Sequence, residues 1–258
     1  MQTEKELFEN LLTKHTVKEI AVILKVTKST VYKKLKKYNL LKTSRTCNRY
    51  SVNQEFFKDI DTEEKAYWLG FLYADGCIYK GASKNSYRMQ INIQASDSDV
   101  LEKFKNSIQA NNPITYKTIQ EKHNIATLKI NNTIFCEYLM SHGVIPRKSL
   151  ICTFPEIDDN LVRHFIRGYF DGDGCISKYK HKNKQQFNIT GGIDMLESIK
   201  LIFKENNINT YLYSINHSIA NVLATSSKKT IKLLYDFLYD NSHIFLNRKK
   251  EKFEEIVL

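Results

Sequence analysis

The sequence predicts an α+β fold of two pseudosymmetric halves, each with the element order αββαββα, packed through a pair of similar helices and preceded by a small all-α domain. Three observations support this prediction. An apolar pattern that ends in Asp-Gly occurs twice, at Trp68–Gly76 and Ile166–Gly174. The same order of helical and strand-like periodicity follows each copy. The residues before the first copy have only helical periodicity and carry much of the positive charge.

The two apolar patterns predict motif helices that approach each other closely. Each pattern has two small residues four positions apart, which share one face of a helix and form a flat stripe. These small residues are the pairs Gly70/Ala74 and Gly168/Gly172. The glycine that follows each acid, Gly76 or Gly174, suits the left-handed position that ends many helices.

The acidic residues at the ends of the motif helices predict a cation site. If the two helices pack side by side and parallel, Asp75 and Asp173 meet where the helix dipoles are negative, and two carboxylates there can bind a divalent metal. Simple turn chemistry is the alternative, although the duplication disfavours it. A calcium loop beginning at Asp171 is disfavoured because Cys175 and Lys182 occupy positions that require oxygen ligands.

The element order of each half follows from its periodicity. The first half is predicted to contain a motif helix at 62–75, strands Cys77–Lys80 and Tyr87–Gln94, a helix Ser98–Gln109, strands Thr115–Ile119 and Ile125–Ile130, and a helix Thr133–His142. The second is predicted to contain a motif helix Asn160–Asp173, strands Cys175–Tyr179 and Gln186–Thr190, a helix Asp194–Asn206, strands Thr210–Ile215 and Ala220–Thr225, and a helix Lys228–Tyr239. Each copy closes on an Arg-Lys pair, whose lysines are Lys148 and Lys249. Solvated charge is the alternative interpretation of either lysine.

Residues 1–42 are predicted to form a helix-turn-helix domain. Within Thr16–Leu40, Thr16 and Glu19 have the spacing of a capping box. The shared core would consist of Ile20, Ala21, Leu24, Val26, Val31 and Leu35. The second helix would present to DNA the residues Lys28, Ser29, Thr30, Tyr32 and Lys33. Lys25 stands where such turns often have Gly, which costs about 1 kcal/mol if its φ is positive. A helical hairpin that only decorates the main body is the alternative.

The charge distribution predicts a nucleic-acid partner. The formal net charge is +11, and residues 1–50 alone account for +8 of it. Residues 43–55 have no apolar periodicity and are predicted to be a basic linker, in which Arg45 and Arg49 could follow a phosphate backbone. The two halves are then assigned to residues 56–152 and 153–258.

The cysteine pattern and the hydropathy indicate an intracellular protein. Five cysteines without C-x-x-C spacing favour reduced, buried thiols, with Cys77 and Cys175 at matching core positions. No apolar leader or membrane-spanning run is present in the sequence, so the expected location is the cytoplasm of a bacterial or phage-infected cell, or an organelle.

The strands after each motif helix predict two sheets with one wet face each, because polar and apolar residues alternate along them. The polar positions of the first are Ser86, Arg88, Gln90, Asn92 and Gln94, and those of the second are Gln186, Asn188 and Thr190. Amide and guanidinium side chains of this kind read base edges in the major groove. Nearby lysines suit phosphates, namely Lys80, Lys178 and Lys180.

The two motifs, the duplication and the matched lysines together resemble the LAGLIDADG homing endonucleases over about residues 56–258. The resemblance implies that Asp75 and Asp173 bind Mg²⁺ or Mn²⁺ between the halves, with Gly76 and Gly174 beside them. It also implies catalytic roles for Lys148 and Lys249, which would polarise the attacking water or stabilise developing charge. Gln94 is a weaker catalytic candidate, since it ends a strand near the metal site. His164 and Arg167 are interpreted as edge or solvent residues.

The function expected from these features is metal-dependent, site-specific cleavage of double-stranded DNA by a monomer without membrane association. A DNA-binding transcription regulator or an RNA-splicing maturase that binds intron RNA with the same fold is the alternative. An RNA-binding structural protein is disfavoured because no exposed aromatic platform is evident in the strands.

Overall fold

The structure is a computed structural model that describes residues 3–38, 40, 50–81, 86–119, 123–146, 151–179, 184–215 and 220–257. The chain divides into two compact units, Met1–Arg49 and Tyr50–Leu258. The finer predicted limits at residues 42, 55 and 152 stay predictions. Four predicted site residues lie outside the described residues: Arg45, Arg49, Lys148 and Lys180.

The N-terminal unit has three helices, α1 (Glu4–Lys14), α2 (Val17–Ile23) and α3 (Lys28–Lys37). Each begins at a threonine that caps it, and Thr16 forms the predicted capping box with Glu19. The core of the unit consists of Phe8, Ile20, Ala21, Val31 and Leu35, with Leu24 packed against it.

The turn between α2 and α3 is the predicted one, with Lys25 at a φ of 51°. The Val26 amide donates to the Ala21 carbonyl across the end of α2, which is the bond pattern of a left-handed helix end. Val26 was predicted to be in the core, and this is wrong: its side chain is 38% exposed. Lys25, the left-handed residue before it, changes the direction of the chain, so Val26 is partly exposed to solvent.

The larger unit contains two halves with the same architecture. The first half consists of α4 (Glu63–Asp75), β1 (Gly76–Lys80), β2 (Tyr87–Gln94), the short 3-10 helix η1 (Ala95–Asp97), α5 (Asp99–Ser107), β3 (Thr115–Ile119), β4 (His123–Ile130) and α6 (Thr133–Ser141). The second consists of α7 (Asp159–Asp173), β5 (Gly174–Tyr179), β6 (Lys184–Gly191), α8 (Ile193–Glu205), β7 (Tyr211–Ser214), β8 (Asn221–Thr225), α9 (Lys228–Tyr239) and α10 (Asn247–Val257).

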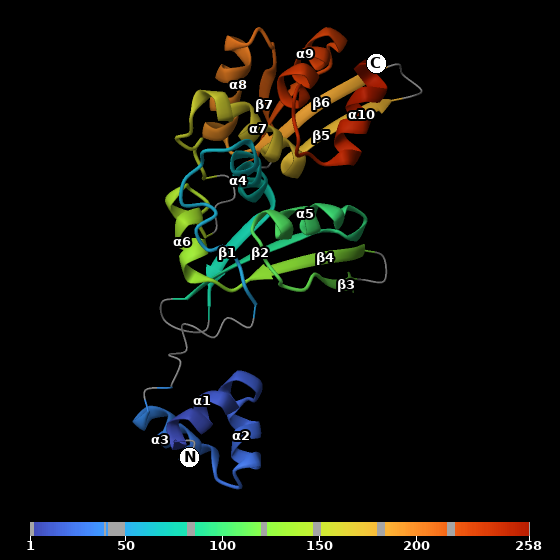
Figure 1. Cartoon of the computed structure of the whole chain (residues 1–258). Coiled ribbons are helices and arrows are strands. Elements are labelled where there is room, and N and C mark those ends of the chain that lie inside the picture. The colour runs from blue at the N-terminus through green and yellow to red at the C-terminus, as the bar shows by residue number, and fades with distance from the viewer. Residues whose placement is uncertain are drawn as a thin grey trace. The chain divides into compact units, whose positions relative to one another are not determined.

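Each half has one antiparallel four-stranded sheet, with the strand orders β1-β2-β4-β3 and β5-β6-β8-β7. Figure 1 shows the motif helices α4 and α7 in the middle of this unit, between the two sheets and their covering helices. The predicted αββαββα order is therefore confirmed for both halves. Helix α10 follows the second copy and was not predicted.

Gly76 and Gly174 do not adopt the predicted left-handed conformation. Their φ values are −74° and −95°, so each motif helix passes directly into a strand. Glycine is required there for space instead. A Cβ on Gly76 would stand 2.6 Å from the Leu72 carbonyl oxygen, and a Cβ on Gly174 would overlap the ring of Phe170.

Candidate active site and nucleic-acid interface

The motif helices α4 and α7 pack with their backbones in contact, as the small-residue stripes predict. A Cβ on Gly70 would overlap the Phe165 carbonyl, and a Cβ on Gly168 would overlap the Tyr67 carbonyl. Farther along, a Cβ on Gly172 would overlap that of Ala74. The residue numbers of the facing positions increase together along both helices. The helices therefore run parallel, and both end at the same side of the unit.

The two predicted metal-binding acids are the last residues of these helices. Asp75 ends α4 and Asp173 ends α7. The position of a Cβ on Gly172 lies 3.3 Å from Asp75 Oδ2, so the Asp75 carboxylate lies against the residue that precedes Asp173. The packing thus brings an acid from each half to one seam, at the negative end of both helix dipoles.

The donor set at this seam suits a hard divalent cation. Mg²⁺ typically binds to one or two carboxylates and takes its other ligands from water and substrate phosphates. No cluster of three or more His, Cys, Asp or Glu side chains that could hold a metal occurs within the described residues. A cation between Asp75 and Asp173 would therefore need oxygen ligands from water, backbone and DNA.

Lys249 reaches this seam from α10 and is almost completely buried. Its ammonium group donates to the carbonyl oxygens of four residues around the end of α7: Phe170, Asp171, Gly172 and Gly174. These bonds are 2.6–3.3 Å long. Burial lowers the pKa of Lys249, while the nearby carboxylates of Asp171 and Asp75 act in the opposite direction. The predicted metal-site residue Gly174 thus has a carbonyl that already accepts from an ammonium group.

Asp171, the earlier acid of the second motif, is a buried carboxylate. It accepts hydrogen bonds from the Tyr67 hydroxyl at 2.8 Å, the Leu246 amide at 2.7 Å and the Tyr239 hydroxyl at 3.2 Å. Burial raises the pKa of Asp171, and Lys249 is the largest influence in the opposite direction. Its counterpart in the first motif, Tyr73, donates to the His142 carbonyl at 2.5 Å.

The wet face of the first sheet carries the predicted polar residues. Register pairs Gln90 with Cys77 and Lys129, and Asn92 with Thr127. Gln90 and Thr127 both donate to the Asn92 side-chain oxygen at 2.8 Å. Arg88 and Gln94, two other predicted contacts on this face, are partly exposed and exposed, respectively. Lys80 is exposed too, but it pairs with Tyr87 on the opposite face of the sheet. Because Gly76 pairs with Ile91, Gln94 lies just beyond the start of β1, near the end of α4.

The wet face of the second sheet has the equivalent order. Gln186, Asn188 and Thr190 are partly exposed, and they alternate with the buried Phe187 and Ile189. Gly174 pairs with Ile189, so Thr190 lies near the end of α7 as Gln94 does near α4. Lys178, predicted to contact phosphate, pairs with Gln185 on the opposite face of the sheet, and its ammonium group donates to the Glu255 carbonyl of α10 at 2.7 Å.

The two cysteines that follow the motifs are not in the core, which corrects the prediction made for them. Cys77 and Cys175 are exposed thiols, whereas Cys136 and Cys152 are buried. Cys77 pairs with Gln90, and Cys175 pairs with Asn188, so both lie on the wet faces. The sequence alone does not show which face of the sheet Cys77 and Cys175 share. That assignment requires the register in which β1 pairs with β2 and β5 pairs with β6.

An exposed aromatic pair also lies on the second wet face, contrary to the expectation that the strands lack one. Tyr211 and Tyr213 are 47% and 43% exposed, and their ring centroids are 5.8 Å apart. Register pairs Tyr211 with Ala224, which pairs in turn with Asn188. The tyrosines therefore share a face with the predicted base-reading residues.

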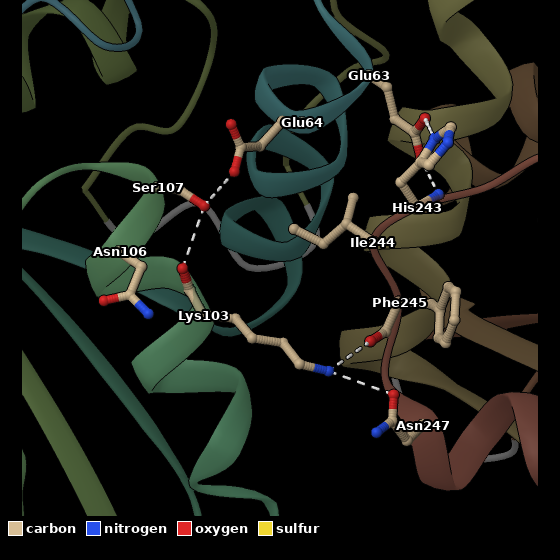
Figure 2. Close-up of a pocket in the computed structure, with 9 residues that line it drawn as sticks. All are labelled: Glu63, Glu64, Lys103, Asn106, Ser107, His243, Ile244, Phe245 and Asn247. Carbon is tan, nitrogen blue, oxygen red and sulfur yellow. Dashed lines mark hydrogen bonds and ion pairs between the residues drawn. The ribbon is translucent and has the colours of Figure 1, made fainter.

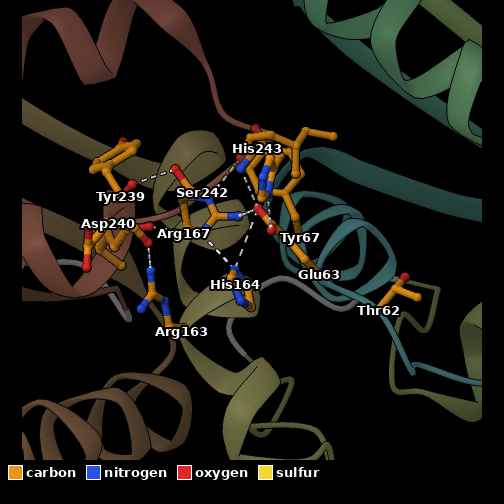
Figure 3. A network of polar contacts seen from close by, with 12 residues as sticks. Thr62, Glu63, Tyr67, Arg163, His164, Arg167, Tyr239, Asp240, Ser242 and His243 are labelled. Atoms are coloured by element: carbon orange, nitrogen blue, oxygen red, sulfur yellow. Dashed lines mark hydrogen bonds and ion pairs between the residues drawn. The ribbon is translucent and has the colours of Figure 1, made fainter.

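The interpretation of Arg167 as an edge residue is wrong. Its side chain is fully buried and donates to Glu63 Oε1 at 2.6 Å and to the carbonyls of Ile244 and Leu238 at 2.9 Å. Figure 3 shows Arg167, His164 and His243 converging on Glu63. This network joins the first residue of α4, Glu63, at the opposite end of that helix from Asp75, to the middle of α7 and the segment before α10.

A pocket of about 710 Å³ adjoins that network. It lies between α4, α5 and the segment before α10, as Figure 2 shows. Its polar groups bond to one another: Lys103 donates to Asn247 Oδ1 and the Phe245 carbonyl, and Ser107 donates to Glu64. The pocket thus lies between the two halves, and neither Asp75 nor Asp173 lines it.

Comparisons with known proteins identify this architecture. Residues 160–238 match the family model described as a LAGLIDADG-like domain. The larger unit has the LAGLIDADG endonuclease fold. The meganuclease I-SmaMI bound to uncleaveable DNA is similar with a TM-score of 0.56 and 11% identity, over 76% of this chain and 91% of that chain. No curated protein matches the chain at a significant level of sequence similarity.

Two further solved structures agree with this assignment of the fold. The I-LtrWI LAGLIDADG homing endonuclease bound to target DNA has a TM-score of 0.51 and 15% identity, over 79% of this chain and 89% of that chain. I-AabMI bound to uncleaved DNA has a TM-score of 0.50 and 14% identity, over 74% and 89%. None of the helices in the described part of the present chain has the length and hydropathy needed to cross a bilayer.

Proposed function

We propose that this protein is a divalent-metal-dependent endonuclease that cuts double-stranded DNA at a specific site. The observation that supports this most directly is the meeting of α4 and α7, which brings Asp75 and Asp173 from separate halves to one seam. A duplex has two strands, and one acid from each half can serve one strand. One chain contains both halves, so the proposed active form is a monomer.

The residues around the seam would divide the chemistry of phosphodiester hydrolysis. A bound Mg²⁺ or Mn²⁺ would activate water, neutralise phosphate charge and stabilise the leaving oxygen. Asp75 and Asp173 would hold it. The wet faces of the two sheets would position the duplex, with amide side chains such as Gln90 and Asn188 directed to base edges.

Cleavage of one strand by each half gives a direct test. Asp75→Asn and Asp173→Asn should each abolish double-strand cleavage and leave DNA binding within about three-fold, because each removes charge and not shape. The assay is plasmid cleavage with Mg²⁺ or EDTA, using sites that the wild-type protein selects from a random DNA library. Full double-strand cleavage by the Asp75→Asn/Asp173→Asn protein would contradict the proposed metal site.

The N-terminal unit is proposed to add DNA affinity through α3. Its exposed residues include Lys28, Ser29, Thr30, Tyr32 and Lys33, and no acidic residue occurs within α3. Replacing Lys28 and Lys33 by Ala in the full chain should weaken binding and make the slope of log Kd against log salt shallower by about 2, as two lost phosphate contacts require. An unchanged salt slope would remove α3 from the interface.

Contact with intron RNA is a subordinate proposal. Its support is the exposed Tyr211/Tyr213 pair, since aromatic side chains stack on unpaired bases. An intron-splicing assay beside the plasmid assay separates the two activities.

A further inference from the structure

The outer part of the second wet face carries a row of exposed apolar side chains. β7 is the edge strand of its sheet, and Tyr211 and Tyr213 lie on it. Ile215 follows β7, and its amide continues the strand pairing by donating to the Ala220 carbonyl at 3.2 Å. Side chains two positions apart on a strand share a face, so the three lie together. They are 40–47% exposed. We name Tyr211, Tyr213 and Ile215 the apolar row.

The neighbouring strand, β8, supports this row with small apolar side chains. Tyr211 pairs with Ala224, and Tyr213 pairs with Val222. Ala224 and Val222 are buried although they lie on the wet face, so neighbouring side chains, the two tyrosine rings among them, cover them. None of these four residues carries a charge. The outer part of this face is therefore a packed, uncharged surface.

The first sheet has a different chemistry at the equivalent positions. Gly76 begins β1 and pairs with Ile91. Gly174 begins β5 and pairs with Ile189, so the two registers align the sheets residue by residue. The first half has two threonines and two exposed lysines where the second half has Tyr213, Ile215, Val222 and Ala224: Thr115, Lys117, Thr127 and Lys129. One face offers charge and hydroxyl groups, and the other offers an apolar surface.

The edges of base pairs in the major groove explain what such a surface can recognise. Lysines suit phosphates, whereas apolar side chains suit the C5-methyl group of thymine. The apolar row shares its face with Asn188 and Thr190, which are proposed to lie against bases. We propose that the apolar row binds the C5-methyl groups of pyrimidines, which in unmodified DNA are thymines, and so selects the half-site bound by the second half. This inference rests on the proposed recognition of duplex DNA by the wet faces.

The spacing of the tyrosine rings favours a duplex over unpaired RNA as the ligand of the row. The ring centroids are 5.8 Å apart, with 22° between the ring planes. A base between two rings needs a gap of about 7 Å, twice the roughly 3.4 Å between stacked bases. The two rings therefore pack against each other and do not leave room for a base between them.

The binding test removes methyl groups from DNA without changing any hydrogen-bonding group. Sites are first selected from a random library by binding to the full chain in EDTA, which requires no cleavage. Deoxyuridine then replaces thymine in one half-site at a time. In one half-site, affinity should fall about four-fold for each contacted methyl group, or about 0.8 kcal/mol. In the other it should change by less than about two-fold. At the sensitive positions, 5-methylcytosine should bind about four-fold more tightly than cytosine.

Variants of the row assign the sensitive half-site to the second half. Tyr213→Thr/Ile215→Lys gives the row the residues of the first half at two exposed positions, and urea denaturation checks that it folds. Its affinity should change by less than about two-fold when deoxyuridine replaces thymine in either half-site. Tyr116→Thr is the matched control and should keep the wild-type effect. Tyr116 is an exposed tyrosine of β3 that pairs with Ala126, on the other face of its sheet from Lys117.

The outcomes separate this inference from the endonuclease function. A protein that binds its selected sites but cuts neither strand with Mg²⁺ contradicts the endonuclease function, and the deoxyuridine series still decides the role of the apolar row. Selected half-sites without thymine, equal deoxyuridine effects in both half-sites, or effects that persist in Tyr213→Thr/Ile215→Lys would overturn that role. Unchanged DNA recognition in this variant with weaker binding of single-stranded RNA would assign the row to RNA and would also overturn it.

Discussion

The two halves of the larger unit share one fold but stabilise their motif helices differently. Both helices use glycine to bring the backbones together. In α4 the residue before that glycine is Leu69, and in α7 it is Arg167; both side chains are fully buried. Near the C-terminal ends of the helices, the buried Tyr73 of α4 corresponds to the buried carboxylate of Asp171 in α7. At two equivalent positions, the second motif helix therefore has a buried charged side chain where the first has an uncharged one.

The buried charges of α7 have a cause outside the contact of α4 with α7, namely the other segments that each helix packs against. Arg167 and Asp171 bond to the carbonyls and amide of the segment between α9 and α10, including Ile244 and Leu246. That segment has no regular structure, so its backbone groups need side-chain partners. The first half has no equivalent of α10 among its described residues. The buried charges of α7 thus accompany the extra C-terminal helix.

The glycine contacts should give the largest effect on stability, and they also distinguish backbone from side-chain crowding. Gly168→Ala places a methyl group against the Tyr67 carbonyl, so the helices must separate; we expect a loss of at least about 3 kcal/mol in the free energy of unfolding. Gly172→Ala overlaps the Ala74 methyl group and approaches Asp75 Oδ2 to 3.3 Å, but it overlaps no backbone carbonyl and should cost less. The compensating change Ala74→Gly should restore stability at Gly172 and not at Gly168. Urea denaturation measures all four variants.

Equal losses at the two glycines, or rescue of Gly168→Ala by Ala74→Gly, would contradict the observed facing of the helices. Gly70→Ala is a further check, because its methyl group would meet the Phe165 carbonyl. It should therefore behave like Gly168→Ala.

The ion pair between the buried Arg167 and the partly exposed Glu63 should rank next. Arg167→Leu gives α7 the residue that α4 has at Leu69, but it leaves two carbonyls without their donor and Glu63 with only the donors from His243. Breaking a fully buried pair costs about 3–5 kcal/mol, and the partial exposure of Glu63 places the expected loss at or below the low end of that range; removal of both charges costs less. We expect Arg167→Leu/Glu63→Leu to be more stable than Arg167→Leu alone in urea denaturation. A single variant within about 1 kcal/mol of wild type would show that the pair contributes little.

The sequence predicted the features that depend on local spacing. Small residues four apart in each motif were enough to predict the contact of α4 and α7, and alternation along β2 and β6 was enough to assign their polar faces. The repeat itself predicted the topology, because two similar chains of elements fold in the same way. The positions of the acids at one seam followed from these two facts.

The features that were missed depend on partners far away in the chain. Arg167 was interpreted as a surface residue because its neighbours in the sequence supply no opposite charge. Its partner Glu63 lies 104 positions earlier in the chain. Cys77 resembled a core residue because its face is set by its register with Gln90. The Asp-Gly glycines resembled helix ends, yet crowding by Leu72 and Phe170 selects glycine there. No local pattern contains this information.

The smallest predicted effect is the pH response of the charged network in the second half. Burial, with the neighbouring Arg167 charge, lowers the pKa of His164 from 6.5 to about 4. The unfolded chain therefore takes up this proton as pH falls below 6.5, while the folded protein does not until about pH 4. Stability should decline across that window and be fully present above it. The loss is on the order of 1–2 kcal/mol after solvent screening.

Urea denaturation between pH 7 and pH 4.5 measures this slope. His164→Gln cannot take up a proton, so its stability should fall less steeply than that of wild type over this range. His15→Gln, at an exposed position in the N-terminal unit, is the control and should keep the wild-type slope. A wild-type slope in His164→Gln would mean that His164 is protonated equally in both states, and the bond in which its Nδ1 accepts from Arg167 would then be absent in solution.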